Sequence, residues 1–241
     1  MAHPEQVEFI KSCLIRFRNE FKNSKNILEI GSQNINGSIR DYFEGAKFKN
    51  WVGLDLGKGK DVDYVIPGEL IQLPNGWADI AFSTECFEHA ENWQDILLNI
   101  IRITHQNSFV ILTFAGIGRA THGTIDSNID SSPFTTSYYK NISIEEFSKS
   151  LELNNYFTKY SLEVNNNHGD TYFWGIRNDN YKNTELMSLE DSLSRARGQI
   201  NLLIKANKNL EFQLDLFKNP FKAINKLFKK IYLVIKTRFT K

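Results

Sequence analysis

The sequence predicts an α/β fold with a doubly wound, largely parallel sheet whose strand direction is mixed at one edge. Two observations predict it. Between residues 26 and 153, short apolar runs alternate with stretches in which apolar residues recur at helical spacing. That alternation is typical of parallel sheets covered by helices. The last two apolar runs, 156–164 and 171–177, have no room for a helix between them, so they should form an antiparallel pair around a turn at 165–170.

The individual elements follow from the same periodicities. Apolar residues at helical spacing predict an N-terminal helix over 5–22. The near-continuous apolar run at 109–114 indicates a strand buried on both faces of the sheet. The other expected strands are 26–30, 51–55, 62–66 and 79–83, and the other expected helices begin near Gly37 or span 93–104 and 144–153.

The chain should divide into a domain at 1–178, a polar linker at 179–185, a coiled coil at 186–217 and a basic amphipathic helix at 218–241. Apolar residues from Leu186 to Phe217 fall at heptad positions, with Asn207 at an a position, which favours a parallel two-stranded coiled coil. The expected partner is a second copy or another helix. The alternative is a single helix that packs on its own domain. Pro220 separates the two helical segments.

Charge is distributed unevenly along the chain. The net charge is +1, but residues 218–241 hold eight Lys or Arg and no acid, which leaves the rest at −7. The basic tail could lie on an anionic membrane surface or be a solvated or partner-bound helix. An acidic body argues against nucleic acid as a partner. Two widely spaced cysteines and the lack of an apolar run of about 20 residues predict a cytoplasmic protein, with peripheral contact at the inner membrane surface as an option.

A ligand-binding loop is expected after the first strand. Gly31 follows that strand directly, and a residue without a Cβ lets the backbone approach a ligand closely. The loop lacks the G-x-G-x-x-G pattern of dinucleotide sites, and Glu29 stands just before it, which suits a cationic ligand without phosphates. Asp55 ends the second strand, where an acid can accept hydrogen bonds from a ribose diol.

These residues belong to an ordered series: L-E-I-G at 28–31, V-G-L-D at 52–55, G-E-L-I-Q-L-P at 68–74 and A-D-I-A-F-S-T-E-C-F-E-H at 78–89. The series resembles the class I S-adenosylmethionine (SAM)-dependent methyltransferase superfamily, nearest to the group that includes the ubiquinone-biosynthesis methyltransferases. The resemblance covers roughly residues 25–115. It implies a Rossmann-like seven-stranded sheet and SAM as the methyl donor.

The resemblance also implies roles for particular residues. Glu29, Gly31 and Ser32 would face the methionine part, Asp55 the ribose hydroxyls, and Glu69 the adenine. The floor below the sulfonium would be formed by Thr84, Glu85 and Cys86. Two departures concern contact geometry: the first loop lacks a second central glycine, and Glu69 stands where the family commonly has Asp.

The long segment 115–141 should cover the transferred methyl group, because it leaves the carboxyl end of a central strand. It holds Arg119, Tyr138 and Tyr139 as candidate acceptor-binding residues. His122 is the candidate general base and His89 a less favoured one. Positioning alone could suffice without a base. No metal site is predicted: 126–137 resembles a calcium loop but lacks its glycine and its final glutamate, which leaves only a weak Mg²⁺ option at Asp126 or Asp130.

The segment also resembles methyltransferases encoded with glycosyltransferases in surface-polysaccharide pathways, which implies a sugar or glycan hydroxyl as the acceptor. Three alternatives remain open. The protein could methylate RNA, with the basic tail as the contact surface. It could methylate a small apolar molecule such as a quinone or lipid. It could also be a SAM-binding scaffold without activity.

Overall fold

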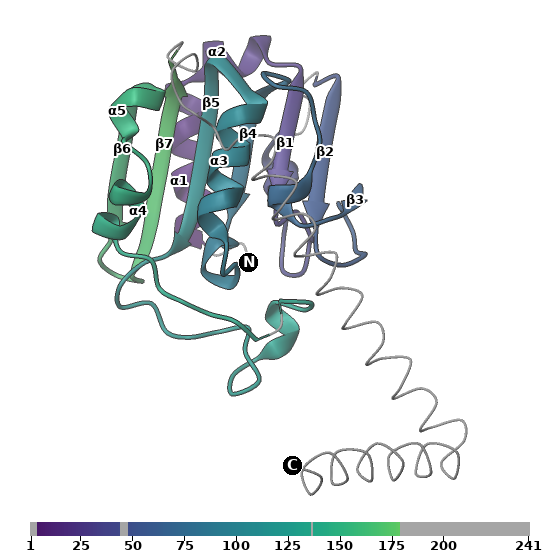
Figure 1. Ribbon diagram of the computed structural model, residues 1–241, viewed down its shortest axis with the longest axis vertical. Helices are drawn as coiled ribbons and strands as arrows, with labels where there is room; N and C mark the ends of the chain where they lie inside the picture. The colour runs from purple at the N-terminus through teal and green to yellow at the C-terminus, as the bar shows by residue number, and fades with distance from the viewer. Residues whose placement is uncertain (1–3, 44–47, 136, 179–241) are drawn as a thin grey trace, which may run out of the picture. The chain divides into compact units, whose positions relative to one another are not determined.

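A single mixed sheet organises the described part of the chain, which in this computed structural model comprises residues 4–43, 48–135 and 137–178. Within these residues the strand order is β3-β2-β1-β4-β5-β7-β6 (Figure 1). Strands β1 to β5 run parallel, whereas β7 runs antiparallel to both β5 and β6. The strands are β1 (Asn26–Ile30), β2 (Asn50–Asp55), β3 (Tyr64–Val65), β4 (Ala78–Thr84), β5 (Thr104–Ala115), β6 (Phe157–Asn165) and β7 (Asp170–Arg177). The expected mixed sheet with a terminal hairpin is confirmed.

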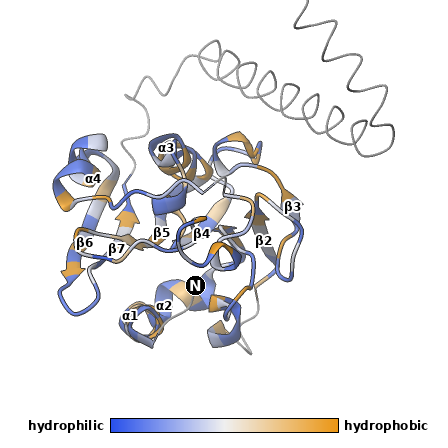
Figure 2. Cartoon of the chain, turned by 90° about the horizontal axis from the view of Figure 1, so that it is seen from below, coloured by the Kyte–Doolittle hydropathy of each residue, from blue (hydrophilic) through white to orange (hydrophobic). Residues whose placement is uncertain are grey.

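Helices cover both faces of the sheet, as expected of a doubly wound fold. Figure 2 shows α1 and α2 on one face and α3 and α4 on the other. The α-helices are α1 (Pro4–Arg16), α2 (Arg18–Asn23), α3 (Trp93–Ile103), α4 (Ile144–Ser150) and α5 (Leu153–Tyr156). Short 3-10 helices are η1 (Ile39–Phe43), η2 (Gly68–Leu70), η3 (Phe87–His89) and η4 (Ile129–Ser131). Since strand side chains alternate between faces, each face has its own hydrophobic core.

The two cores share β1, β4 and β5. On the α3 side, Leu28, Ala81 and Leu112 are fully buried among α3 residues such as Ile100. On the α1 side, Ile27, Phe82 and Ile111 are fully buried with Ile10 of α1. Adjacent residues of one strand therefore enter opposite cores, which fixes the register of the central strands, because a one-residue slip would exchange the two faces.

Several boundaries differ from the sequence-based expectation. The N-terminal helix is broken at Phe17, whose ring packs against Phe109 and Trp174 at centroid distances of 4.4 and 4.7 Å. The segment after Gly37 forms only the short η1 instead of an α-helix. The expected helix over 144–153 is interrupted, because buried Leu151 takes an extended conformation. Strand β5 begins at Thr104, earlier than its apolar stretch suggests.

The linker at 179–185, the coiled coil at 186–217 and the basic helix at 218–241 lie outside the described residues, so they stay predictions. Among the residues that are described, no helix combines the length and apolar character needed to cross a membrane.

Candidate active site

The candidate site lies at the edge of the sheet where β1, β2, β4 and β5 end. The loop that follows β5 extends beyond this edge (Figure 1). Because β7 runs in the opposite direction, its first residue, Asp170, pairs with the last residue of β5, Ala115. Loops from four parallel strands and the start of an antiparallel one therefore meet at the same edge, which is where ligands bind in open α/β sheets.

Gly31 joins the first loop to the segment after β4. Its φ is +77°, a conformation that favours glycine, and its N–H donates to the carbonyl of Leu54. A Cβ on Gly31 would lie 2.8 Å from the Cβ of Cys86. Next to it, Ser32 is buried and its hydroxyl has no hydrogen-bond partner among the described residues. Gly31 and Cys86 thus lie in contact, while the predicted roles of Gly31, Ser32 and Cys86 toward a cofactor stay predictions. Burial raises the pKa of the Cys86 thiol to about 12, which keeps it neutral.

Asp55 connects the loops after β1 and β2. One carboxylate oxygen accepts from the backbone N–H of Gln33 at 3.0 Å, and the other from that of Leu56 at 2.7 Å. Burial raises the pKa of Asp55 despite these bonds. Just beyond it, a Cβ on Gly57 would overlap the ring of Phe134, so the segment after β5 reaches across to the Asp55 loop.

Glu29 is buried and bonded to protein groups. Its Oε2 accepts from Arg40 Nε at 2.9 Å and from Trp51 Nε1 at 2.7 Å. Burial raises the pKa of Glu29 to about 7 in spite of the neighbouring guanidinium. These contacts give the carboxylate a structural role beside β1, and its predicted contact with the methionine part stays a prediction.

The remaining predicted cofactor residues lie on η2 and at the end of β4. Glu69 belongs to η2, which is held by the Asn99 amide through the carbonyls of Gly68 and Ile71. Thr84 is the last residue of β4. Glu85 follows at a φ of +52°, and its Oε1 accepts from Thr113 Oγ1 at 2.8 Å.

Three rings from distant parts of the chain form the centre of the acceptor side. The ring of His89 on η3 lies 5.1 Å from that of His122 and 5.4 Å from that of Tyr139, centroid to centroid. His122 and Tyr139 are 5.0 Å apart. The structure thus brings together both histidines and one of the two tyrosines that the sequence singles out. Burial raises the pKa of the Tyr139 hydroxyl.

The two histidines have similar hydrogen-bonding patterns. His122 Nδ1 lies 3.1 Å from the carbonyl of Ala120, and His89 Nδ1 lies 3.4 Å from that of Tyr138. His89 Nε2 lies 2.9 Å from Ser132 Oγ. Burial lowers the pKa of His89 to about 4 and also lowers that of His122, so both rings are neutral at pH 7.

Glu88 is the site residue that the sequence analysis missed. It is 0% exposed, and neither carboxylate oxygen has a hydrogen-bond partner among the described residues. His122 Nε2 lies 3.8 Å from its Oε1. Burial, and then the charge of Glu85, raise the pKa of Glu88 well above its usual range. The spacing Glu-x-x-Glu-His at 85–89, followed by a histidine in the next long loop, was the available signal.

The other acceptor-side residues anchor the loop. Arg119 Nε lies 3.3 Å from Oδ1 of the buried Asp170. Asn141 donates to the carbonyls of Gly116 and Arg119. Tyr139 donates its hydroxyl to the carbonyl of Ala120, and Tyr138 contributes its backbone carbonyl to His89. Arg119 and Tyr139 therefore have structural partners beside any contact with an acceptor.

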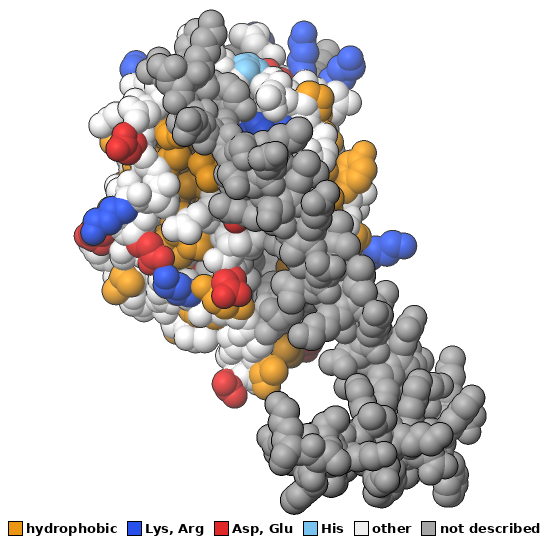
Figure 3. Space-filling model, in the orientation of Figure 1, with side chains coloured by type: hydrophobic (Ala, Val, Ile, Leu, Met, Phe, Trp, Pro, Cys, Tyr) orange, Lys and Arg blue, Asp and Glu red, His pale blue; other side chains and the backbone are white. Residues whose placement is uncertain are grey.

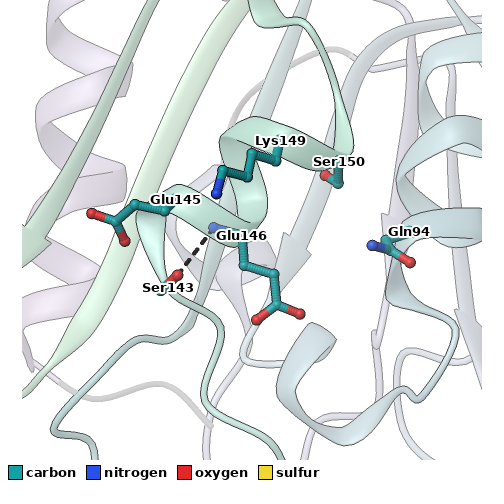
Figure 4. Close-up of a pocket in the computed structure, with 6 residues that line it drawn as sticks. All are labelled: Gln94, Ser143, Glu145, Glu146, Lys149 and Ser150. Carbon is teal, nitrogen blue, oxygen red and sulfur yellow. Dashed lines mark hydrogen bonds between the residues drawn. The ribbon is translucent and has the colours of Figure 1, made fainter.

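A separate open depression lies between α3 and α4 (Figure 4). It is lined by Gln94, Ser143, Glu145, Glu146, Lys149 and Ser150. Ser143 caps α4 by accepting from the N–H of Glu146, and the Glu146 carboxylate pairs with Lys140 at 2.6 Å. These polar groups serve the helix start, and the depression contains none of the residues predicted to bind a ligand.

The surface seen in Figure 3 carries charges of both signs. Lys and Arg side chains stand at separate points of that face, with Asp and Glu side chains between them and hydrophobic side chains interspersed. This distribution on the visible, described surface differs from the continuous basic stripe that tracks a nucleic-acid backbone.

Solved structures of low sequence identity share this fold. A SAM-dependent methyltransferase from Archaeoglobus fulgidus is 15% identical, with a TM-score of 0.50 over 71% of this chain and 94% of its own. The CurJ carbon methyltransferase is 12% identical, with a TM-score of 0.51 over 72% of this chain and 54% of its own. The SpnF cyclase is 8% identical, with a TM-score of 0.52 over 74% of this chain and 83% of its own.

These likenesses show that the described domain has the fold of SAM-dependent methyltransferases, as the sequence resemblance implies. No protein-family profile matches the sequence, and no curated protein matches it. Because a cyclase shares the fold, the reaction has to be argued from the site itself.

Proposed function

We propose that this protein is a SAM-dependent methyltransferase that methylates a hydroxyl oxygen. The observation that carries the proposal is the contact between Gly31 and Cys86, which brings the first loop against the segment 85–89. One end of that contact leads to Asp55 through the N–H of Gln33, and the other leads to the cluster of His89, His122 and Tyr139. A donor bound at the first loop would therefore lie next to an acceptor bound at the cluster.

The cofactor side offers groups that match the parts of SAM. Asp55 provides carboxylate oxygens for the ribose hydroxyls, and charge-assisted hydrogen bonds of this type are among the stronger ones. The buried hydroxyl of Ser32, which lacks a partner among the described residues, suits the polar methionine end. Cys86 is neutral and small, so it can line the methyl group without competing for it as a nucleophile.

The acceptor side supports transfer to oxygen. A hydroxyl must lose its proton as it attacks the methyl carbon, and His122 is neutral and partly exposed, with Nδ1 held by a backbone carbonyl. The carbon–sulfur bond breaks as the oxygen–carbon bond forms, and its electron pair stays on sulfur, which gives S-adenosylhomocysteine. A sugar or glycan hydroxyl as the acceptor rests on the sequence resemblance to surface-polysaccharide methyltransferases.

A second candidate acceptor is a hydroxyl on an apolar molecule such as a quinone or a lipid. The observation that favours it is the apolar surface of the segment after β5, where Ile117 is 66% exposed and Ile125 74% exposed. Ile129 and Phe134 of the same segment are also exposed. Exposed apolar side chains at a site are typical of surfaces that contact an apolar ligand or partner.

Binding of SAM and S-adenosylhomocysteine by calorimetry tests the proposal. Asp55→Ala should weaken binding by about 1–3 kcal/mol, the range for a lost hydrogen bond to a charged group. Asp79→Ala is the matched control, because Asp79 also accepts two backbone N–H bonds, but from Lys25 and Asn26 at the start of β1. Intact affinity in the Asp55 variant, or no binding by the wild-type chain, would refute the cofactor assignment.

Transfer of a labelled methyl group then separates the acceptors. Glycans and monosaccharides with free hydroxyls form one panel, and quinols and lipid alcohols form the other. Product from the first panel alone supports the glycan hydroxyl. Product from the second panel alone replaces it with the apolar acceptor. SAM that binds but is never consumed with either panel would favour a SAM-binding scaffold.

A further inference from the structure

The starting observation is a buried acid whose oxygens have no hydrogen-bond partner among the described residues. Glu88 is fully buried, and both carboxylate oxygens lack such partners. Its backbone is well held, since its carbonyl accepts from the N–H of Lys140 at 2.8 Å. A buried carboxyl without partners costs free energy, so native proteins keep such groups where a ligand completes them.

The two neighbouring histidines each have an Nε2 atom available as an acceptor near Glu88, and the Nε2 of His89 is in contact with Ser132 Oγ at 2.9 Å. A ring nitrogen that faces a backbone carbonyl must carry the proton, which assigns Nδ1–H to both His122 and His89. Each Nε2 then keeps its lone pair. His122 Nε2 faces Glu88 Oε1 across 3.8 Å, so an acceptor faces an acceptor, and a cation between them would satisfy both.

We propose that Glu88, His89 and His122 bind one divalent first-row transition-metal ion, with Zn²⁺ as the reference ion, through one carboxylate oxygen and the two Nε2 atoms. Ligand atoms from the three residues all lie within 4.8 Å of one another. Two imidazoles and a carboxylate are a donor set that suits zinc or iron better than magnesium or calcium.

The geometry fits after a small contraction. Two ligand atoms at about 2.0–2.2 Å from a tetrahedral zinc ion lie roughly 3.3–3.5 Å apart. The pair formed by His122 and Glu88 is already near that value at 3.8 Å. A pair at the upper limit of 4.8 Å must close by about 1.4 Å, and Ser132 must release His89 Nε2. The carbonyls of Ala120 and Tyr138 already act as the outer partners that metal-bound histidines almost always have.

The chemical role of the ion rests on the proposed function. Three protein ligands leave a coordination position open for the acceptor hydroxyl. A bound hydroxyl has a lowered pKa, so its proton passes to solvent and the remaining alkoxide attacks the methyl carbon of SAM. His122 is then a ligand instead of the base. This predicts that Glu88 is required for transfer, whereas a base mechanism through His122 alone would tolerate its loss.

Metal binding can be measured without any acceptor. The full chain, treated with a chelator, is titrated with Co²⁺ while visible absorption is recorded, and with Zn²⁺ by calorimetry. We expect one ion per chain and cobalt bands typical of a tetrahedral or five-coordinate site. Glu88→Gln and His122→Asn should each weaken binding by roughly 100-fold or more, since the loss of even outer-shell partners costs 10–100-fold.

The matched control is His105→Asn. His105 also pairs with an acid, with Nε2 3.1 Å from Asp79 Oδ1, but it lies outside the cluster at an exposed position. Its substitution should leave metal affinity unchanged. Saturation by neither ion, or affinity that persists in both the Glu88 and His122 variants, would overturn the proposal. Near-ultraviolet circular dichroism checks folding, and His122, whose side chain is 18% exposed, gives a second variant if Glu88→Gln does not fold.

Binding of S-adenosylhomocysteine to the same variants separates the two proposals. Variants that retain affinity for the cofactor but lose affinity for the metal support both proposals. A wild type that binds the metal but not the cofactor, with variants that lose the metal, would support the metal site and refute the methyltransferase. Cofactor binding by a wild type that takes up no metal would refute the metal site alone.

Discussion

Two buried glutamates at the same edge of the sheet differ in their hydrogen-bond partners. Glu29, beside the cofactor loop, accepts hydrogen bonds from Arg40 and Trp51. Among the described residues, Glu88, beside the acceptor loop, has no hydrogen-bonded side chain on its carboxylate oxygens. The neutral His122 lies 3.8 Å away, and the backbone N–H groups of Glu88 and Ala115 favour the charged form of the carboxyl. Both glutamates are less than 5% exposed.

The difference separates a structural acid from one that is available to a ligand. Burial of a charge is tolerated when partners from the protein replace water, as they do around Glu29. Around Glu88, the replacement has to come from a proton or from an ion. The buried acid of the cofactor region is thus satisfied without a ligand, whereas the buried acid of the acceptor region is not.

The largest expected effect comes from removing the partner of the satisfied acid. Arg40→Met leaves Glu29 buried with Trp51 alone and should lower the free energy of unfolding by about 3–5 kcal/mol at pH 8. Glu88→Gln in metal-free protein should change it by less than about 1 kcal/mol, because no protein partner is lost. Urea denaturation measures both. Equal losses of unfolding free energy in the two variants would contradict the distinction between a satisfied and an unsatisfied acid.

The pH dependence of stability sharpens the same contrast. Burial raises the pKa of Glu29 from 4.5 to about 7. Between pH 4.5 and pH 7, Glu29 is therefore protonated in the folded state and ionised in the unfolded state. The stability from this group is therefore present below pH 4.5 and is lost as pH rises through 7. As pH rises from 5 to 8, the free energy of unfolding of Glu29→Gln should fall by about 3 kcal/mol less than that of the wild type. Parallel pH profiles of the two proteins would contradict this prediction.

A smaller effect is expected where the two regions touch. Gly31→Ala introduces both a strained φ and a Cβ 2.8 Å from that of Cys86, and should cost about 2–3 kcal/mol of stability and weaken SAM binding. Gly118→Ala is the control, because Gly118 also has a positive φ but no atom within 4 Å of its added Cβ. A similar loss in both variants would mean that strain, not the contact, dominates.

The smallest effect concerns Glu85, the second buried acid of the acceptor region. Thr113 Oγ1 accepts from Gln6 Nε2 and donates to Glu85 Oε1, so α1 supports Glu85 through β5. Thr113→Val keeps the shape of the side chain but removes both bonds, and should cost about 1–2 kcal/mol. Thr171→Val, on β7, is a matched change at a buried hydroxyl that has no hydrogen-bond partner among the described residues. A larger loss from Thr171→Val would argue against a supporting role for Thr113.

Much of the fold could be predicted because its patterns are local. The strand at 26–30 matches the structure fully, and the hairpin strands differ by one residue at their ends. Boundaries went wrong where tertiary packing prevails over periodicity. Phe17 leaves the helical path to pack on Phe109. Strand β5 starts at Thr104, which pairs with Ala78 of β4 before an irregularity in register, and regular pairing resumes at Phe109.

The candidate site was predictable only in part. Gly31 and Asp55 stand at strand ends, so sequence order places them. Whether an acid is satisfied depends on partners far along the chain. Glu29 meets Arg40 and Trp51, 11 and 22 residues away, whereas in the described part of the chain no side chain forms a hydrogen bond with the Glu88 carboxylate. Residue type and spacing do not show such pairings, so the sequence analysis assigned Glu29 to the ligand and did not single out Glu88.

Because β7 runs antiparallel to β5, the acceptor loop is held by residues that are synthesised after it. Strands β1, β2, β4 and β5 are all synthesised before residue 116. Arg119 of the acceptor loop is held by Asp170 and packs on Gly169, which are synthesised some fifty residues later. Since a domain generally folds as a unit, the cofactor edge and the acceptor loop should become ordered together, once residues 169 and 170 are available.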